Sequence, residues 1–397
     1  MANDSKSKIM KYDFERIVDR KGTFSLKWEY RKDLMQKRDI IPLWVADMDF
    51  EVPLPVRQAI QKRAEHEIYG YTLLSDSYYQ AIVDWMEKRF TWKVDKKWVV
   101  FTPGVVPAVN FAVQAFSRPG EKIIIQPPVY YPFGLAVENN GRQLVNNPLK
   151  REENRYVIDY DHLEGVIDKD TRLLILCSPH NPVGRVWSTE ELDRLAEICI
   201  KNKVLIISDE IHADLVLPPY VHIPTATLGP EVADITISCT SPNKTFNTAG
   251  LQVANNIISN KDLRRRFQEA ANSAGIELAN AFGGTALEAA YTAGEEWLEQ
   301  LLDYLQGNYD YLVEFTRKSL PGFKVYPLEG TYLVWLDGSA YREDDKRLKD
   351  HLLRKARVWL DEGSKFGPGG EGFLRMNIAL PRPLLQKALE RMRLALT

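Results

Sequence analysis

Short apolar runs alternate with longer amphipathic stretches between about residues 95 and 260. The runs are rich in Val and Ile and are apolar at consecutive positions, which is typical of strands buried on both faces. Ser188 and Glu191 form a capping-box pattern, and it predicts that an amphipathic helix starts there. Alternating strands and helices indicate a mostly parallel sheet with helices on both faces. The predicted strands are residues 98–102, 122–126, 172–177, 204–208, 234–239 and 253–258.

The pattern changes outside this block. Residues 285–320 predict long helices, and residues 323–380 predict shorter strands and helices with turns at Pro321-Gly322 and at residues 367–370. We therefore expect an α/β fold with a large domain over residues 51–285 and a smaller α+β domain over residues 286–397. The N-terminal segment, residues 1–50, is expected to join the small domain.

Composition excludes several classes of protein. The 397 residues carry a net charge of −2, so no basic surplus favours nucleic acid or an anionic membrane as a partner. No apolar stretch approaches the ~20 residues of a membrane span, and the polar N-terminus does not resemble a signal peptide, so we expect a cytoplasmic protein. The six histidines lack metal-ligand spacing, which predicts no catalytic metal. The three cysteines, expected as buried free thiols, are Cys177, Cys199 and Cys239.

Two motif matches are interpreted as coincidental. Residues 367–372 satisfy G-x-G-x-x-G, but they lead into an apparent strand, whereas a dinucleotide-binding motif opens a helix. Ser241 and Lys244 satisfy the S-x-x-K pattern of penicillin-binding enzymes, but the S-D-N and K-T-G strings that accompany it are absent.

Polar residues follow the predicted strands at five points. Because ligands of such sheets bind beyond the carboxyl ends of the strands, we expect these residues to converge. Any one of them alone could instead be a turn, a core contact, a helix cap or a solvated side chain. The five points are the Gly104 turn before Val105 and Val106, Tyr130 between prolines, Asn181 before Pro182, Asp209 at a strand end, and Lys244 after Ser241.

The chemistry of these residue types suggests one kind of ligand. Backbone N–H groups at the helix start after Gly104 suit a phosphate, and Tyr130 could stack on a flat heterocycle. Asp209 is costly to bury without a cation, and a protonated pyridine nitrogen would supply one. A desolvated Lys244 near other positive charge would lose its proton easily and become a nucleophile for a carbonyl.

In this order, the motifs resemble the class I/II aminotransferases of the fold-type-I superfamily that depends on pyridoxal 5′-phosphate (PLP). Strings at residues 42–50, 69–72, 208–212 and 373–381 resemble the MalY/PatB branch, which contains cystathionine β-lyases and related cysteine-S-conjugate β-lyases. The resemblance implies a PLP-dependent transferase-like fold, PLP as the cofactor and a homodimer with shared active sites.

The resemblance also implies a role for each position. Lys244 would bind PLP as a Schiff base and move the substrate's Cα proton, while Asp209 would pair with the pyridinium nitrogen. Two positions depart from the ordinary aminotransferase pattern: His212 replaces a Tyr that contacts the ring's O3′, and Gln252 replaces an Arg that pairs with phosphate. The remaining expected contacts are Tyr130 stacking on the ring, Asn181 at O3′, Arg375 at the substrate carboxylate, and Val105, Val106, Ser241 and the partner subunit's Tyr71 at the phosphate.

The implied reaction is α,β-elimination from L-cystathionine or another cysteine S-conjugate, which gives a thiol (homocysteine from cystathionine), pyruvate and ammonia. An amino-acid aminotransferase of class I/II is the alternative, because both reactions share their first steps. A second alternative is a regulatory binding protein with residual lyase activity, since members of this branch can also restrain a transcription activator.

Overall fold

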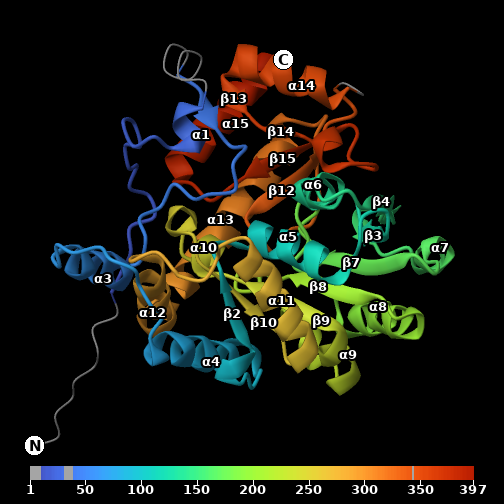
Figure 1. The fold of residues 1–397 in the computed structure, drawn as a ribbon. Helices are drawn as coiled ribbons and strands as arrows, with labels where there is room; N and C mark the ends of the chain where they lie inside the picture. Colours follow the sequence, from blue (N-terminus) through green and yellow to red (C-terminus); the bar gives the residue numbers. More distant parts are fainter. Residues whose placement is uncertain (1–9, 31–38, 342–343) are drawn as a thin grey trace, which may run out of the picture.

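The computed structural model describes residues 10–30, 39–341 and 344–397. The expectations for residues 1–9, which include the polar N-terminus, and for residues 31–38 lie outside the described residues. A seven-stranded sheet forms the centre of the molecule in the order β2-β10-β9-β8-β7-β3-β4 (Figure 1). All its strands run parallel except β10, which is antiparallel to both neighbours. The strands are β2 (Val99–Thr102), β3 (Lys122–Ile125), β4 (Gln143–Asn146), β7 (Thr171–Cys177), β8 (Leu205–Asp209), β9 (Thr236–Thr240) and β10 (Ala254–Ile257).

All six strands predicted from the sequence are present, and the largest shift of a start is two residues, in β9. Asp234 was expected in a strand but lies in helix α9 (Pro230–Ile235), which starts with Pro230 in its first turn. Proline favours that position because its fixed φ suits a helix start. The strand β4 was missed because it is an edge strand with polar, partly exposed residues at both ends, Gln143 and Asn146.

Alternating side chains of the central strands contribute to two separate cores. In β3, Ile123 and Ile125 pack on one face and Ile124 packs on the other. The first face is covered by helices α5 (Val105–Phe116), α6 (Pro132–Asn139) and α11 (Lys261–Ser273), and the second by α8 (Thr189–Asn202). The capping box predicted at the start of α8 is confirmed, because Ser188 Oγ accepts from the Glu191 N–H and the Glu191 carboxylate accepts from the Ser188 N–H.

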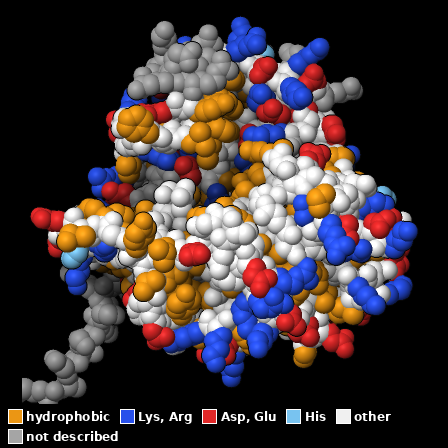
Figure 2. All heavy atoms as spheres, viewed as in Figure 1, with side chains coloured by type: hydrophobic (Ala, Val, Ile, Leu, Met, Phe, Trp, Pro, Cys, Tyr) orange, Lys and Arg blue, Asp and Glu red, His pale blue; other side chains and the backbone are white. Residues whose placement is uncertain are grey.

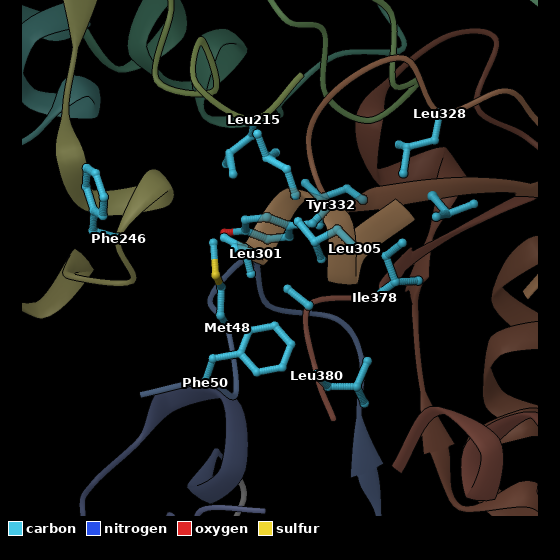
Figure 3. Close-up of a cluster of buried hydrophobic side chains, with 14 of the residues drawn as sticks. Met48, Phe50, Leu215, Phe246, Leu301, Leu305, Leu328, Tyr332, Ile378 and Leu380 are labelled. Atoms are coloured by element: carbon cyan, nitrogen blue, oxygen red, sulfur yellow. The ribbon is translucent and has the colours of Figure 1, made fainter. Parts of the chain in front are cut away.

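A third core joins the sheet to the rest of the chain (Figure 3). It includes side chains of α4 (Asp76–Phe90), α12 (Gly283–Ala293) and α13 (Glu295–Ser319), and α3 (Leu54–Ala64) packs beside α12. Beyond α13 lies a four-stranded antiparallel sheet in the order β11-β12-β15-β14. It consists of β11 (Lys324–Val325), β12 (Leu333–Asp337), β14 (Asp361–Glu362) and β15 (Phe373–Asn377), accompanied by α14 (Asp345–His351), a π-helical turn (Leu352–Ala356) and α15 (Arg382–Leu396).

The N-terminal segment reaches the C-terminal part of the chain. Strand β1 (Ile41–Pro42) pairs in parallel with β13 (Val358–Trp359). We propose domain boundaries at residues 50 and 285, with this pairing as their support on the N-terminal side. The remaining short elements are α1 (Leu26–Glu29), the β5 (Lys150–Glu152) and β6 (Arg155–Val157) hairpin, α7 (Tyr160–Val166), α10 (Pro242–Thr245) and 3-10 turns at Lys96–Trp98, Thr225–Thr227, Ala249–Leu251 and Gly363–Phe366.

An ion network around Arg185 is buried between the two sheets. The Arg185 Nε lies 2.9 Å from a Glu329 carboxylate oxygen, and its Nη2 lies 2.7 Å from Glu191. The third guanidinium nitrogen donates to the Tyr156 carbonyl. Glu329 also accepts from the Val186 N–H at 2.8 Å. Every nitrogen of the buried guanidinium therefore has an acceptor, as a buried charge requires.

Among residues 10–30, 39–341 and 344–397, no helix has the length and apolar character needed to cross a bilayer.

Candidate active site

A cavity of about 280 Å³ opens at the carboxyl ends of the central strands. In Figure 2 the surface is hollowed between helix α5 and the C-terminal elements above it. Most of the residues that sequence analysis singled out line this cavity, as expected for a doubly wound sheet. They are Val105, Val106, Tyr130, Asn181, Asp209, His212 and Lys244, and they are joined by Ala46, Gly104, Cys177, Ile211, Asn243, Ala249 and Gln252 among others.

Lys244 extends into the cavity from α10, a single helical turn that follows β9. Its Nζ donates to the Ala46 carbonyl at 2.6 Å. Burial lowers the pKa of Lys244 to about 8; the nearby Arg375 also lowers it, while Asp47 and Asp209 oppose the shift. The amine can therefore exchange a proton near neutral pH, as a general base must.

Asp209 ends β8 and is 4% exposed. Within the described residues its carboxylate accepts one hydrogen bond, from the Ile211 N–H at 3.1 Å. Burial raises the pKa of Asp209 to about 7, Glu210 adds to the shift, and the Ile211 hydrogen bond and Lys244 oppose it. A cation placed against this carboxylate would reverse the shift and relieve the cost of burying the charge.

His212 lies two residues beyond the strand-end acids and packs edge-on against the Tyr332 ring. Its Nδ1 is buried without a hydrogen-bond partner among the described residues. Burial, followed by Lys244 and Arg375, lowers the pKa of His212 to about 3, so the imidazole is neutral. A neutral imidazole with an open nitrogen can still donate to, or accept from, a bound ligand.

The N-terminus of α5 forms another wall of the cavity. Gly104 is the N-cap, and no side chain caps this helix. The N–H groups of Val105 and Val106 have no partner inside the helix, because the first turn of any α-helix leaves its donors free. Such donors and the helix dipole favour an anion, and both residues line the cavity.

Tyr130 and Asn181 lie across the same cavity. Burial raises the pKa of Tyr130 to about 12, so its phenol stays protonated. The Asn181 Oδ1 accepts from Arg375 Nη1 at 3.0 Å, which leaves the Asn181 amide N–H groups to bind a ligand oxygen.

Arg375 lies behind the cavity wall on β15. Its Nη2 donates to the Trp44 carbonyl at 2.7 Å and to the Asp361 carboxylate at 2.6 Å. Its Nε is buried without a partner among the described residues, so the guanidinium keeps a donor for a ligand. Sequence analysis missed Asp361, which follows a run of only three apolar residues, 358–360. It also missed Ala46, which contributes only a backbone carbonyl.

Two predicted phosphate contacts lie outside the cavity lining. The Ser241 hydroxyl donates to the Val253 carbonyl at 2.6 Å and accepts from the Asn243 N–H at 3.1 Å. Tyr71 is 98% exposed, on the segment between α3 and α4. The roles of both residues toward a phosphate remain predictions.

The described part of the chain contains no group of three or more His, Cys, Asp or Glu side chains that could hold a metal ion. The prediction of buried free thiols is confirmed for all three cysteines.

The polar groups of the cavity fit the parts of PLP one by one. Free N–H groups at the start of α5 suit its phosphate, and the underpartnered Asp209 carboxylate suits a protonated ring nitrogen. Asn181 offers donors for a ring oxygen, and the Lys244 amine suits a carbonyl carbon.

Comparison with known protein families decides the classification. A sequence model described as "Aminotransferase class I and II" matches residues 38–392, which is nearly the whole chain. The chain belongs to the class I and II aminotransferase family. The match includes both the cavity residues and the four-stranded sheet that carries Arg375.

Three similar proteins cover nearly the same length. The chain is 42% identical to cystathionine β-lyase PatB of Bacillus subtilis over 97% of this chain and 100% of that protein. It is 32% identical to protein MalY of Escherichia coli over 95% of this chain and 97% of that protein. The structure of cystalysin from Treponema denticola, which contains a pyridoxal 5′-phosphate cofactor, matches with a TM-score of 0.95 and 37% identity, covering 98% of this chain and 99% of that one. The expected family and fold type are therefore confirmed.

Proposed function

We propose that this protein is a PLP-dependent carbon–sulfur lyase of the cystathionine β-lyase type. It takes a cysteine S-conjugate such as L-cystathionine and releases a thiol, pyruvate and ammonia by α,β-elimination. The observation that carries this proposal is the Lys244 amine, which extends into the cavity with a pKa of about 8 and faces the underpartnered Asp209. Relatives named as cystathionine β-lyases over the full chain length support the C–S bond as the one that breaks.

When bound, PLP supplies an electron sink that stabilises negative charge at the substrate's Cα. Asp209 keeps the ring nitrogen protonated, and the nitrogen's positive charge in turn keeps Asp209 ionised. Val105 and Val106 would bind the phosphate through their N–H groups, Asn181 would donate to the ring oxygen and Tyr130 would stack on the ring. These contacts would hold the cofactor in the cavity.

Arg375 and Lys244 act on the substrate. The Arg375 guanidinium binds the α-carboxylate through its free Nε and so orients Cα. The neutral Lys244 amine then takes the Cα proton, and its pKa of about 8 allows it to return that proton at neutral pH. The electron pair left at Cα forms the new double bond as the β-thiolate departs.

An assay without any keto-acid acceptor tests the reaction. Purified protein supplied with PLP and L-cystathionine should release pyruvate and thiol over many turnovers. Lys244→Ala should release neither, which excludes a contaminating enzyme. A single turnover that stalls until a keto acid is added would instead identify an aminotransferase.

We further propose a homodimer in which the partner subunit's Tyr71 completes each site. The segment between α3 and α4 exposes Ile68, Tyr69, Tyr71 and Leu73, and Figure 2 shows hydrophobic atoms gathered over this edge of the molecule. Apolar side chains gathered in this way are typical of an interface.

Mixing two impaired variants tests this shared site. Lys244→Ala and Tyr71→Phe each impair their own homodimer. In a hybrid, the subunit that retains Lys244 faces a partner that retains Tyr71, so one site of the two is intact. Re-associated equal mixtures should regain about a quarter of the wild-type activity, whereas no recovery would contradict a shared site.

We also place the protein in the cytoplasm, because its three cysteines are buried as free thiols. Cell fractionation should recover it with cytoplasmic markers.

A further inference from the structure

Two sequence strings that resemble the MalY/PatB branch lie against each other in the structure. One contains Val45 and Asp47, and the other contains Asn377 at the end of β15. The Asn377 Nδ2 donates to the Val45 carbonyl and to the Asp47 carbonyl, both at 2.7 Å. Its Oδ1 accepts from the Ala379 N–H at 2.7 Å. Asn377 is fully buried, and its amide therefore holds two carbonyls of a segment remote in sequence.

The neighbouring carbonyls, those of Trp44 and Ala46, bind side chains of the active site. The Ala46 carbonyl accepts from Lys244 Nζ at 2.6 Å and from the Tyr332 hydroxyl at 2.9 Å. The Trp44 carbonyl accepts from Arg375 Nη2 at 2.7 Å. Figure 3 shows Tyr332 directed toward the segment that carries Met48, and Ile378 on the neighbouring backbone. The hydrogen-bond donors to successive carbonyls of this segment therefore alternate. Asn377 donates to the carbonyls of residues 45 and 47, whereas Arg375 and Lys244 donate to those of residues 44 and 46.

This alternation restricts the orientation of the Ala46 carbonyl. Peptide groups are planar, so a peptide group turns only about the two soft dihedrals on either side of each Cα. Asn377 holds the peptide groups immediately before and after that of Ala46. The Ala46 carbonyl consequently has little freedom to turn away from Lys244.

We propose that Asn377 is a positioning residue for proton transfer: it fixes the Ala46 carbonyl, and that carbonyl holds the Lys244 amine where it takes the Cα proton. One N–H of the neutral amine donates to Ala46, which directs the lone pair elsewhere. The Cα–H bond breaks, an N–H bond forms on Lys244, and the electron pair stays at Cα. The resulting ammonium then makes a stronger, charge-assisted hydrogen bond to the same carbonyl. The inference rests on the proposed function only in assigning the Cα proton to Lys244.

The chain provides a matched control for Asn377. Asn308 on α13 is also fully buried, and its Nδ2 also donates to two carbonyls, those of Ile378 and Leu380, at 2.9 Å each. Those carbonyls have no contact with Lys244. Asn308→Ala therefore removes the same kind of clamp without touching the Ala46 carbonyl.

The first measurement is Cα proton transfer in the PLP-loaded enzyme. L-Alanine lacks a β-leaving group, so exchange of its Cα hydrogen in D₂O, followed by NMR, reports the Lys244 step alone. Asn377→Ala should slow this exchange about 10- to 100-fold, because small displacements of a reacting group are costly. With Cα-deuterated cystathionine, the isotope effect on kcat should also rise. Asn308→Ala should change neither quantity.

An equal isotope effect and an equal exchange rate in both variants and in the wild type would overturn the proposal. The exchange assay is independent of the proposed function, since an aminotransferase would also exchange the Cα hydrogen. Failure to eliminate cystathionine would therefore contradict the lyase assignment and leave this test intact.

The second measurement uses the Lys244 amine in the full chain without cofactor. The groups that face this amine or share its acceptor are Asp47, Asp209, Arg375, His212 and Tyr332. Tyr332→Phe leaves these charges in place and removes only the hydroxyl that competes for the Ala46 carbonyl. Lys244 should then keep its proton to higher pH, whereas Asn377→Ala should make it lose the proton at lower pH.

Peptide mass spectrometry of Lys244 after brief treatment with an amine-reactive reagent at a series of pH values gives this midpoint. Opposite shifts in the two variants support the proposal. Shifts in the same direction, or an unchanged midpoint in Tyr332→Phe, would overturn it even if Asn377→Ala failed to fold.

Discussion

The cofactor cavity and the network around Arg185 both bury charge, but they satisfy it to different degrees. Asp209 is 4% exposed and its carboxylate accepts one hydrogen bond from the described residues. Arg185 is 2% exposed, and all three of its guanidinium nitrogens have acceptors. The charges of the Arg185 network all have partners within one chain, whereas the charged groups of the cavity gain theirs only when a ligand binds.

The difference separates a structural cluster from a reactive one. Matched charges hold two parts of a chain together, and each charge has its partner already in the folded chain. Underpartnered groups have pKa values that move toward neutrality, about 8 for Lys244 and about 7 for Asp209, where a proton can be exchanged. Substitutions in the two clusters should accordingly change different properties.

The largest effect is expected for Lys244→Ala. Elimination should fall at least about 10³-fold, because the nucleophile and the base are both lost. Pyruvate release at saturating substrate measures the change. The cofactor-free variant should be at least as stable as the wild type, since a desolvated amine is removed. A loss of stability would show that Lys244 has a structural role like that of Arg185.

Arg185→Met should act in the opposite way. It leaves the buried Glu329 carboxylate with only the half-exposed Arg155 as a cation, which should cost about 3 kcal/mol of the free energy of unfolding. Urea unfolding of the cofactor-free chain measures this loss. Pairing the change with Glu329→Gln should restore part of the stability. A cost below about 1 kcal/mol for Arg185→Met would contradict the structural role.

Asp209→Asn should change how stability depends on pH. The folded protein raises the Asp209 pKa from 3.8 to about 7, so between these values the folded state binds more protons than the unfolded state. The contribution of Asp209 to stability therefore falls as pH rises from 4 to 7, and Asp209→Asn should remove it, so that the stability of the variant relative to the cofactor-free wild type rises over this range. Thermal unfolding at several pH values measures it. An identical pH dependence in both proteins would count against a buried, unmatched carboxylate.

The smallest effect is expected where charges are paired but exposed. Arg265 and Glu269 lie 2.8 Å apart on the surface of α11, each about 60% exposed. Arg265→Ala should change the free energy of unfolding by less than about 0.5 kcal/mol, because solvent screens the pair. Urea unfolding again provides the value. A cost like that of Arg185→Met would mean that pairing alone, without burial, determines the structural role.

Sequence patterns predicted the strands and most of the cavity for a simple physical reason. Buried strands are apolar on both faces, so a polar residue such as Asn181 or Asp209 at the end of such a run is conspicuous. The Ser188 capping box was equally readable, because both of its hydrogen bonds are local in sequence.

Contacts made by backbone atoms or across long sequence separations could not be predicted. Ala46 contributes only a carbonyl, which every residue has. Asp361 forms an ion pair with Arg375 because β14 and β15 are antiparallel neighbours that place the two residues opposite each other. No local sequence pattern specifies that register. Ser241 matched a motif, but the structure alone showed its hydroxyl bonded to the Val253 carbonyl.

The pairing of β1 with β13 has a consequence for how the protein is made. Ile41 and its partner Val358 are separated by roughly 300 residues. A ribosome adding roughly 5–20 residues per second takes roughly 15–60 s to cover that interval. During this time the segment that will carry the Ala46 carbonyl has neither its strand partner nor Asn377. The seven-stranded sheet can therefore form first, but Lys244 gains a fixed Ala46 carbonyl as its acceptor only near the end of synthesis.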